Sequence, residues 1–169
     1  MYWKILASEI TLKFINLNYF EKGMLFVKIN KIIITSLLLA IGLILHQITP
    51  GIVFGMKPDL LLAFMILSIT ITKNFKMAII TGIVAGILGA LTTTFPGGQL
   101  PNIIDKSVTS IIIYSIYKGL NSSSPLKISS IYFIGTIVSG SVFLTSALFL
   151  FGLPSPFLVL FVSIVLPTS

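Results

Sequence analysis

Several residue types are absent or scarce in this chain of 169 residues, and each absence excludes a class of function. Cysteine is absent, so the chain has neither a disulfide framework nor a thiolate metal or redox site. The one histidine, His46, cannot form a His-rich metal site and gives little support to acid–base catalysis. All 11 basic residues are lysine, so no series of arginines indicates a voltage sensor.

Catalytic and nucleotide-binding motifs are missing as well. The sequence has no GxxxxGK[ST] loop, so it does not bind and hydrolyse ATP by that route. It has no HExxH motif and no nucleophile–His–Asp set. We therefore expect a protein that is not an enzyme, with no catalytic residues, no metal and no cofactor.

Charge is scarce and apolar side chains are abundant. Charged residues make up 9% of the chain and hydrophobic residues 56%, with a mean hydropathy of +1.10. Soluble domains have about 25% charged residues, so this composition indicates a membrane protein. The net charge of +7 comes from lysines that mostly lie in short loops beside apolar segments. That pattern sets membrane topology, and we expect no nucleic-acid partner.

The apolar segments predict an all-α membrane protein, a bundle of about six transmembrane helices. A sixth helix begins near Pro156, and the last thirteen residues reach only about 20 Å, so we expect this crossing to be incomplete. The five preceding helices are predicted at Ile32–Ile48, Leu60–Thr72, Met77–Leu91, Pro101–Lys118 and Ile128–Phe151. Residues 28–169 form the predicted substrate-binding membrane domain, and residues 1–27 an amphipathic or disordered extension.

Lysine placement predicts a cytoplasmic N-terminus, and we expect the protein in the plasma membrane. With that orientation only Lys57 and Lys106 fall outside, and each has an aspartate close by, Asp59 and Asp105. This is a positive-inside distribution. The lysines that fall on the inner side are Lys28, Lys31, Lys73, Lys76, Lys118 and Lys127.

The segment Thr92–Lys106 is the strongest candidate for function. It joins two apolar segments and contains Pro96-Gly97-Gly98, whose glycines permit a backbone concavity that can bind an anion. A polar stripe follows at helical spacing, formed by Asn102, Asp105, Lys106 and Thr109. Such a stripe cannot face lipid, so we expect it to point into the bundle.

Two interpretations of this polar segment remain open. Asp105 and Lys106 could mark the membrane surface, with both side chains in water. Alternatively they form a small-molecule site with the outward Lys57-Pro58-Asp59, which the excess of uncharged polar residues favours because buried polar groups need partners. Those residues are Thr92, Thr93, Thr94, Gln99 and Asn102.

Small residues predict two close helix contacts. Gly82, Gly86 and Gly89 form one face, which we expect inside the fold. Ser36 and Ala40 form another, which could pack internally or contact a partner subunit. At the end of the first span, we expect a capping or interfacial role for His46.

Four motifs resemble the bacterial tryptophan transporters of the TrpP type, which are similar to the substrate-binding S-components of energy-coupling factor transporters. The motifs are Gly55-Met56-Lys57-Pro58-Asp59, Leu91 to Gln99, Pro101 to Lys106 and Val165 to Thr168. The resemblance implies a six-helix protein that captures tryptophan from outside. It also implies a transmembrane coupling subunit and two ATPases as partners, with Ser36 and Ala40 at the contact with the coupling subunit.

For a tryptophan site, Asp105 or Asp59 would pair with the ammonium. Lys57, Lys106 or the amides of Gly97 and Gly98 would bind the carboxylate. Phe95 and Phe54 would line an indole slot, with Gln99 or Asn102 accepting the indole N–H. Thr93 would contribute a hydroxyl.

Three alternatives remain at this stage. The chain could be an S-component-like transporter for another small nutrient. It could be a pore in which the TTTFPGGQ loop re-enters the membrane as a selectivity filter. It could also be a structural protein in which the charged loops bind only each other.

Overall fold

The computed structural model describes residues 29–50, 57–120, 125–153 and 156–168. Within these ranges every regular element is a helix, and the fold is a helical membrane bundle, as predicted. The elements are the first helix Ile29–Ile48, α2 (Leu60–Thr72), α3 (Phe75–Thr92), α4 (Gln99–Gly119), α5 (Pro125–Phe151), α6 (Phe157–Leu160), η1 (Phe161–Val165) and α7 (Leu166–Thr168).

The helix boundaries follow the sequence prediction closely. The bounds of α2 match at both ends, and the other long helices extend the predicted segments by up to three residues at an end. The predicted sixth helix is three short elements in succession, because a π-helical turn, η1, interrupts it. Residues 1–27, the predicted extension, lie outside the described residues.

Length and composition make several helices able to cross a membrane. Three are long and apolar enough, namely Ile29–Ile48, Phe75–Thr92 and Leu126–Phe151, and Leu60–Thr72 is a shorter apolar helix. Helix α4 has 21 residues, a sufficient length, but its polar stripe lowers its hydropathy. A helix of this kind spans a membrane only where other helices cover its polar side.

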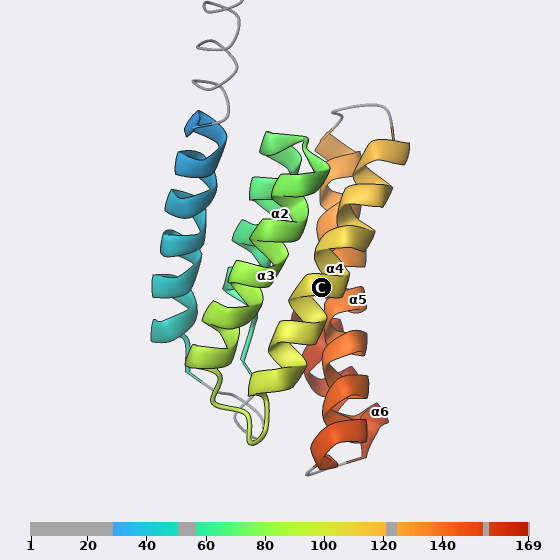
Figure 1. The fold of residues 1–169 in the computed structure, drawn as a ribbon. Coiled ribbons are helices and arrows are strands. Elements are labelled where there is room, and N and C mark those ends of the chain that lie inside the picture. Colours follow the sequence, from blue (N-terminus) through green and yellow to red (C-terminus); the bar gives the residue numbers. More distant parts are fainter. Residues whose placement is uncertain (1–28, 51–56, 121–124, 154–155, 169) are drawn as a thin grey trace, which may run out of the picture. The chain divides into compact units, whose positions relative to one another are not determined.

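By its internal contacts the chain divides into Met1–Ile34 and Thr35–Ser169. In the second unit, antiparallel helices lie side by side, and α4 packs against α2, α3 and α5 (Figure 1). Helix α4 therefore has protein on several sides, which is the condition that its polar residues require.

The glycines of α3 allow α4 to approach closely. A Cβ atom at Gly86 would lie 2.9 Å from the Cα atom of Ile103, and one at Gly82 would lie 2.8 Å from the carbonyl oxygen of Lys106. Both are backbone atoms that cannot move aside, so only glycine fits. The prediction that this small-residue face lies inside the fold is confirmed.

The other small-residue face lies on the outside of the molecule. Thr35 and Leu39 of the first helix are buried, and Thr35 accepts a hydrogen bond from the hydroxyl of Ser68 on α2 at 2.8 Å. Ser36 and Ala40 are exposed on another side of the same helix. They do not pack internally within the part of the chain that the structure describes.

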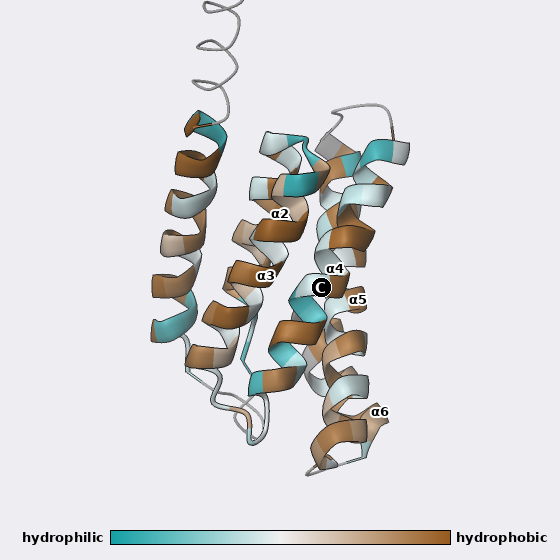
Figure 2. Ribbon diagram, viewed as in Figure 1, coloured by the Kyte–Doolittle hydropathy of each residue, from teal (hydrophilic) through white to brown (hydrophobic). Residues whose placement is uncertain are grey.

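The distribution of polarity is that of a protein surrounded by lipid. Large apolar side chains are exposed on the helices, such as Leu37, Ile44 and Phe149, which is 82% exposed. Two charged side chains, Asp105 and Lys106, are fully buried instead. Figure 2 shows the corresponding hydrophilic stretch within α4, between brown, hydrophobic helices.

Candidate functional site

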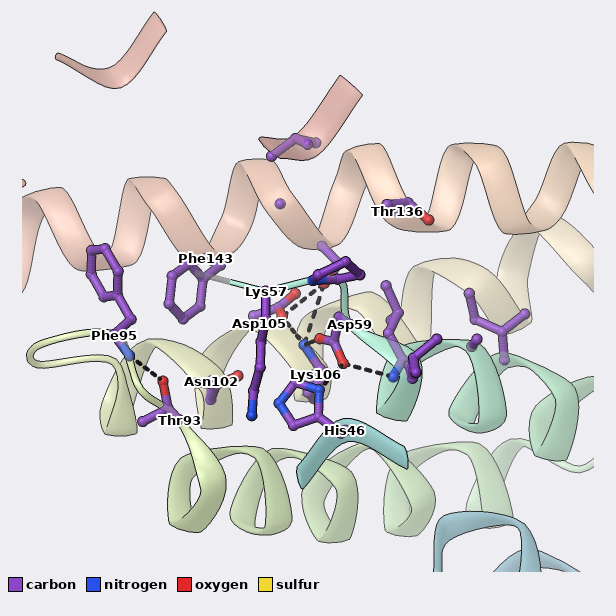
Figure 3. Close-up of a pocket in the computed structure, with 18 of the residues that line it drawn as sticks. His46, Lys57, Asp59, Thr93, Phe95, Asn102, Asp105, Lys106, Thr136 and Phe143 are labelled. Atoms are coloured by element: carbon purple, nitrogen blue, oxygen red, sulfur yellow. Dashed lines mark hydrogen bonds and ion pairs between the residues drawn. The ribbon is translucent and has the colours of Figure 1, made fainter. Parts of the chain in front are cut away.

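The centre of the site is a buried ammonium held between two carboxylates. Lys106 Nζ forms ion pairs with Asp59, which precedes α2, and with Asp105 on α4 (Figure 3). Asn102 and Thr109, the other members of the predicted stripe, are also buried. The expectation that the stripe points into the bundle is confirmed, and Asp105 and Lys106 do not lie in water at the membrane surface.

Local structure brings Asp59 to this centre. Asp59 is the N-cap of α2, and its Oδ1 accepts a hydrogen bond from the backbone N–H of Leu62 at 2.9 Å. An N-cap aspartate satisfies one of the amides left unpaired at a helix start. The cap fixes the carboxylate of Asp59 at the N-terminal end of α2, which lies next to α4.

The three N–H donors of Lys106 all have protein partners. Besides the two carboxylates, Nζ lies 3.4 Å from the hydroxyl oxygen of Ser139 on α5. A lysine ammonium has three donors and no acceptor. Lys106 therefore has no donor left for a ligand while these contacts persist.

The two carboxylates differ in access. The side chain of Asp105 is 1% exposed and that of Asp59 is 24% exposed. Asp105 accepts hydrogen bonds from Thr109 at 2.9 Å and from Ser139 at 2.8 Å, in addition to its pairing with Lys106. Of the two carboxylates, Asp59 is the more accessible.

A cavity of about 340 Å³ adjoins this cluster. Small-molecule sites have volumes of about 300–1,000 Å³, so this is enough for a solute of amino-acid size. Seven of the predicted site residues line this cavity, and Figure 3 shows the three residues of the ion cluster together with the other four. They are Lys57, Asp59, Thr93, Phe95, Asn102, Asp105 and Lys106.

Lys57 is a charged group at the cavity that no ion pair among the described residues engages. Its side chain is partly buried. Burial lowers the pKa of its ammonium from the ordinary value, and the charge of Asp59 opposes that shift. A partly desolvated ammonium is stabilised by an anion placed beside it.

One side of the cavity is apolar and aromatic. Phe95 is 4% exposed, and its ring packs against Phe143 of α5 with centroids 5.5 Å apart in an edge-to-face arrangement. Val165 of η1 also lines the cavity and lies against Gly140, where a Cβ atom would be 2.5 Å from the valine side chain. The polar cluster and this aromatic side meet in one cavity.

The predicted Pro-Gly-Gly segment forms a tight turn outside the cavity lining. The N–H of Gly98 donates to the carbonyl of Phe95 at 3.0 Å, and Gly97 has φ of +72°, with the Phe151 ring against it. Gly97, Gly98 and Gln99 do not line the cavity. Their assignment to the ligand stays a prediction, and Phe54 lies outside the described residues.

The shape of this turn bears on the pore alternative. The segment from Thr93 to Gly98 joins neighbouring ends of α3 and α4, and Asn102 donates a side-chain hydrogen bond to the Gly98 carbonyl at 2.8 Å. Phe95 is buried among side chains of the last helices. The carbonyls of Phe95 and Gly98 accept hydrogen bonds from protein N–H groups, so these two are not free to line an ion filter.

Residues of α5 complete the cavity and were not predicted. They recur at helical spacing on one face of an otherwise apolar helix, which is a signal that the sequence does contain. His46 also lines the cavity and is 7% exposed, although a capping or interfacial role was expected. The residues of α5 are Tyr132, Thr136, Ser139, Gly140 and Phe143.

The site has no cluster suited to a metal ion. Among the residues that the structure describes, no group of three or more His, Asp or Glu side chains could hold one. The two carboxylates of the site already share a lysine.

Removing the charge of Lys106 tests the ion cluster. We expect Lys106→Met to lower the free energy of unfolding by about 3–5 kcal/mol, because two buried carboxylates would lose their counterion. Denaturation in mixed detergent micelles measures this. Lys57→Met is the matched control and should change stability little; adding Asp105→Asn to Lys106→Met should recover part of the loss. Equal stability of the two lysine variants would contradict the cluster.

Comparisons with known proteins identify the family. The family model described as "Tryptophan transporter TrpP" matches residues 28–169. A "Probable tryptophan transport protein" of Clostridium acetobutylicum is 50% identical over 143 residues, which are 83% of this chain and 84% of that protein. Proteins of the same description from Bacillus subtilis and Clostridium perfringens are 43% and 40% identical, over 84% and 81% of this chain and 83% and 81% of theirs.

No solved structure gives a significant match. The family matches fit the composition and the apolar helices described above. The chain therefore belongs to the TrpP tryptophan transporter family, and it is a multi-pass protein of the bacterial plasma membrane and not an enzyme.

Proposed function

We propose that the cavity binds zwitterionic tryptophan and that the protein supports tryptophan uptake into the cell. The relatives described as probable tryptophan transport proteins support the substrate. The observation that carries the proposal is the composition of the cavity. It combines an accessible carboxylate, an ammonium that has no ion pair among the described residues and an aromatic side, which are the complements of the three parts of tryptophan.

The ligand ammonium pairs with Asp59. Asp59 and Asp105 together carry two negative charges, and Lys106 supplies one positive charge, so the buried cluster has an excess of one negative charge. A buried excess charge is costly unless an opposite charge is present. Access favours Asp59, because the Asp105 side chain, although it lines the cavity, is 1% exposed and is engaged by Lys106, Thr109 and Ser139.

The ligand carboxylate pairs with Lys57. The other candidates were Lys106 and the amides of Gly97 and Gly98; the donors of Lys106 are all engaged by protein groups, and the two glycines do not line the cavity. Binding a carboxylate to Lys106 would break an ion pair in the interior, whereas binding one to Lys57 breaks none among the described residues. The ammonium and the carboxylate on the α-carbon of the ligand then meet Asp59 and Lys57, which are two positions apart in the sequence.

The indole ring lies on the aromatic side, beside Phe95 and Phe143. Offset and edge-to-face contacts between aromatic rings contribute about 0.5–1.5 kcal/mol beyond burial alone. Asn102 is assigned to the indole N–H: its NH₂ group already donates to Gly98, so its oxygen is the group that can accept. A site that hydrogen-bonds the indole would discriminate against phenylalanine.

The proposed entry side is extracellular. Four lysines lie at one end of the helices of the second unit, and the polar lining of the cavity belongs to the opposite ends of α2, α3 and α4 (Figure 1). The positive-inside rule then puts the lysine end in the cytoplasm. The lysines are Lys73, Lys76, Lys118 and Lys127.

Uptake is proposed to use a transmembrane coupling subunit and two ATPases, as in S-components. The chain contains no phosphate-binding loop, so ATP hydrolysis would come from partners. The exposed face of Ser36 and Ala40 is suited to close contact with another helix, because small side chains let two backbones approach.

Lys57→Met tests the proposed site. We expect it to weaken tryptophan binding by about 10-fold to 100-fold, as for the loss of a hydrogen bond to a charged group. Tryptamine lacks the carboxylate, so its affinity should not change. Equilibrium dialysis with purified protein measures both, and Lys76→Met, at the lysine end, is the matched control. Equal weakening of both ligands would contradict the role of Lys57, and no saturable tryptophan binding to the wild type would contradict the function.

Ala40→Phe tests the proposed partner contact. A bulky side chain would keep a coupling helix at a distance, so uptake of labelled tryptophan into cells should fall severalfold. Binding to the purified protein should stay unchanged, because Ala40 does not line the cavity. Ile41→Phe, at the next exposed position of the helix, is the control and should transport normally. Normal uptake by Ala40→Phe would contradict a coupling contact at this face.

A further inference from the structure

We infer that His46 contacts the substrate directly and accepts a hydrogen bond from its ammonium through Nδ1. The inference rests on the proposed function and adds a residue that the sequence motifs do not include. It makes His46 and Asp59 a two-acceptor site for a primary ammonium group, beside Lys57, which binds the carboxylate on the same α-carbon of the ligand.

The observation is a buried polar atom without a partner. His46 lies near the end of the first helix, is 7% exposed and lines the cavity. Its Nδ1 is buried and has no hydrogen-bond partner among the described residues. Asp59 Oδ1 lies 3.7 Å from Nδ1, which is beyond hydrogen-bonding distance. Figure 3 shows the imidazole beside Asp59 and Lys106 at the cavity.

Such an atom requires an explanation, because an unsatisfied buried polar group costs about 1–3 kcal/mol. No group among the described residues forms a hydrogen bond with Nδ1 of His46. A ligand that enters the cavity could place a donor between Nδ1 and Oδ1. Two acceptors 3.7 Å apart can both lie within hydrogen-bonding distance of a single nitrogen.

The neighbouring charge decides which ligand group fits. A carboxylate placed against His46 would also lie against Asp59, and the two negative charges would repel. An ammonium at the same point is attracted by Asp59 and has two N–H groups to donate to the two acceptors. The group next to His46 is therefore the ligand ammonium, and the imidazole that receives it is neutral.

A neutral acceptor makes binding sensitive to protons. The charged groups that face His46 are Asp59 and Lys57, which precede α2, with Asp105 and Lys106 on α4; the titratable group from α5 that lines the cavity is Tyr132. Once the imidazole takes up a proton, it can no longer accept, and it repels the ligand ammonium. The zwitterion itself keeps its charges across this range, so tryptophan affinity should fall severalfold between about pH 7 and pH 4.

Two substitutions separate the ring nitrogens. The side-chain amide of asparagine takes nearly the position of Nδ1, and that of glutamine nearly the position of Nε2. We expect His46→Gln to weaken tryptophan and tryptamine alike, by about tenfold or more, because both ligands have the ammonium. His46→Asn should stay within a fewfold of the wild type. Lys57→Met, which weakens tryptophan alone, is the contrast that assigns His46 to the amine end.

Several results would overturn the inference. Wild-type affinity in His46→Gln, or equal losses in both histidine variants, would make His46 a packing residue, while saturable tryptophan binding would leave the proposed function standing. If neither variant folds, the pH dependence of the wild type decides: an affinity that is constant from about pH 7 to pH 4 would overturn the role of the neutral imidazole. A wild type that binds neither tryptophan nor tryptamine would overturn the proposed function and this inference together.

Discussion

The ammonium of Lys106 lies in the interior of a membrane protein and keeps its charge because two carboxylates contact it. Taking an isolated ion out of water costs several kcal/mol even after relaxation, so this arrangement constrains everything around it. Helix α4 must be covered on its polar side, and the glycines of α3 let the two helices close over it. The carboxylate of Asp59 must also reach α4, which its position as the N-cap of α2 provides.

The same arrangement divides the charged side chains into those that hold the helices together and those that, in the proposed site, pair with the ligand. Lys106 and Asp105 are buried and engaged by protein partners, and they hold α4 and α5 together through Ser139. Asp59 takes part in the cluster but is also reached from the cavity. The excess negative charge that remains attracts a cation, and Lys57 supplies the compensating site for an anion. A zwitterion satisfies both requirements without changing the total charge of the site.

The sequence predicted the helices and the buried stripe of α4 because both depend on local patterns. Apolar runs set helix length, and Asp105 beside Lys106 in an apolar chain leaves few places other than the interior. The family resemblance on residues such as Lys57 and Asp59 also agreed with the family that the comparisons identify. The orientation and the coupling partners remain predictions.

Other parts of the site depend on tertiary packing, which local patterns do not encode. Thr136 and Ser139 sit in an apolar helix, where a hydroxyl commonly bonds to its own backbone, as Thr136 does to Tyr132. Nothing local distinguishes the hydroxyl of Ser139, which reaches Asp105. His46 was ambiguous for the same reason, since a histidine at a helix end has many common roles. Gly97 forms a turn against Phe151, a contact with a residue far along the chain.

The central claim is that the buried ion cluster stays intact while tryptophan binds beside it through Asp59. A structure of the protein with bound tryptophan tests this most directly. The account predicts the ligand amino group within hydrogen-bonding distance of Asp59, the carboxylate on Lys57 and the indole beside Phe95 and Phe143, with Lys106 still paired to both aspartates. A ligand carboxylate bound to Lys106 in place of an aspartate, or tryptophan bound outside this cavity, would contradict it.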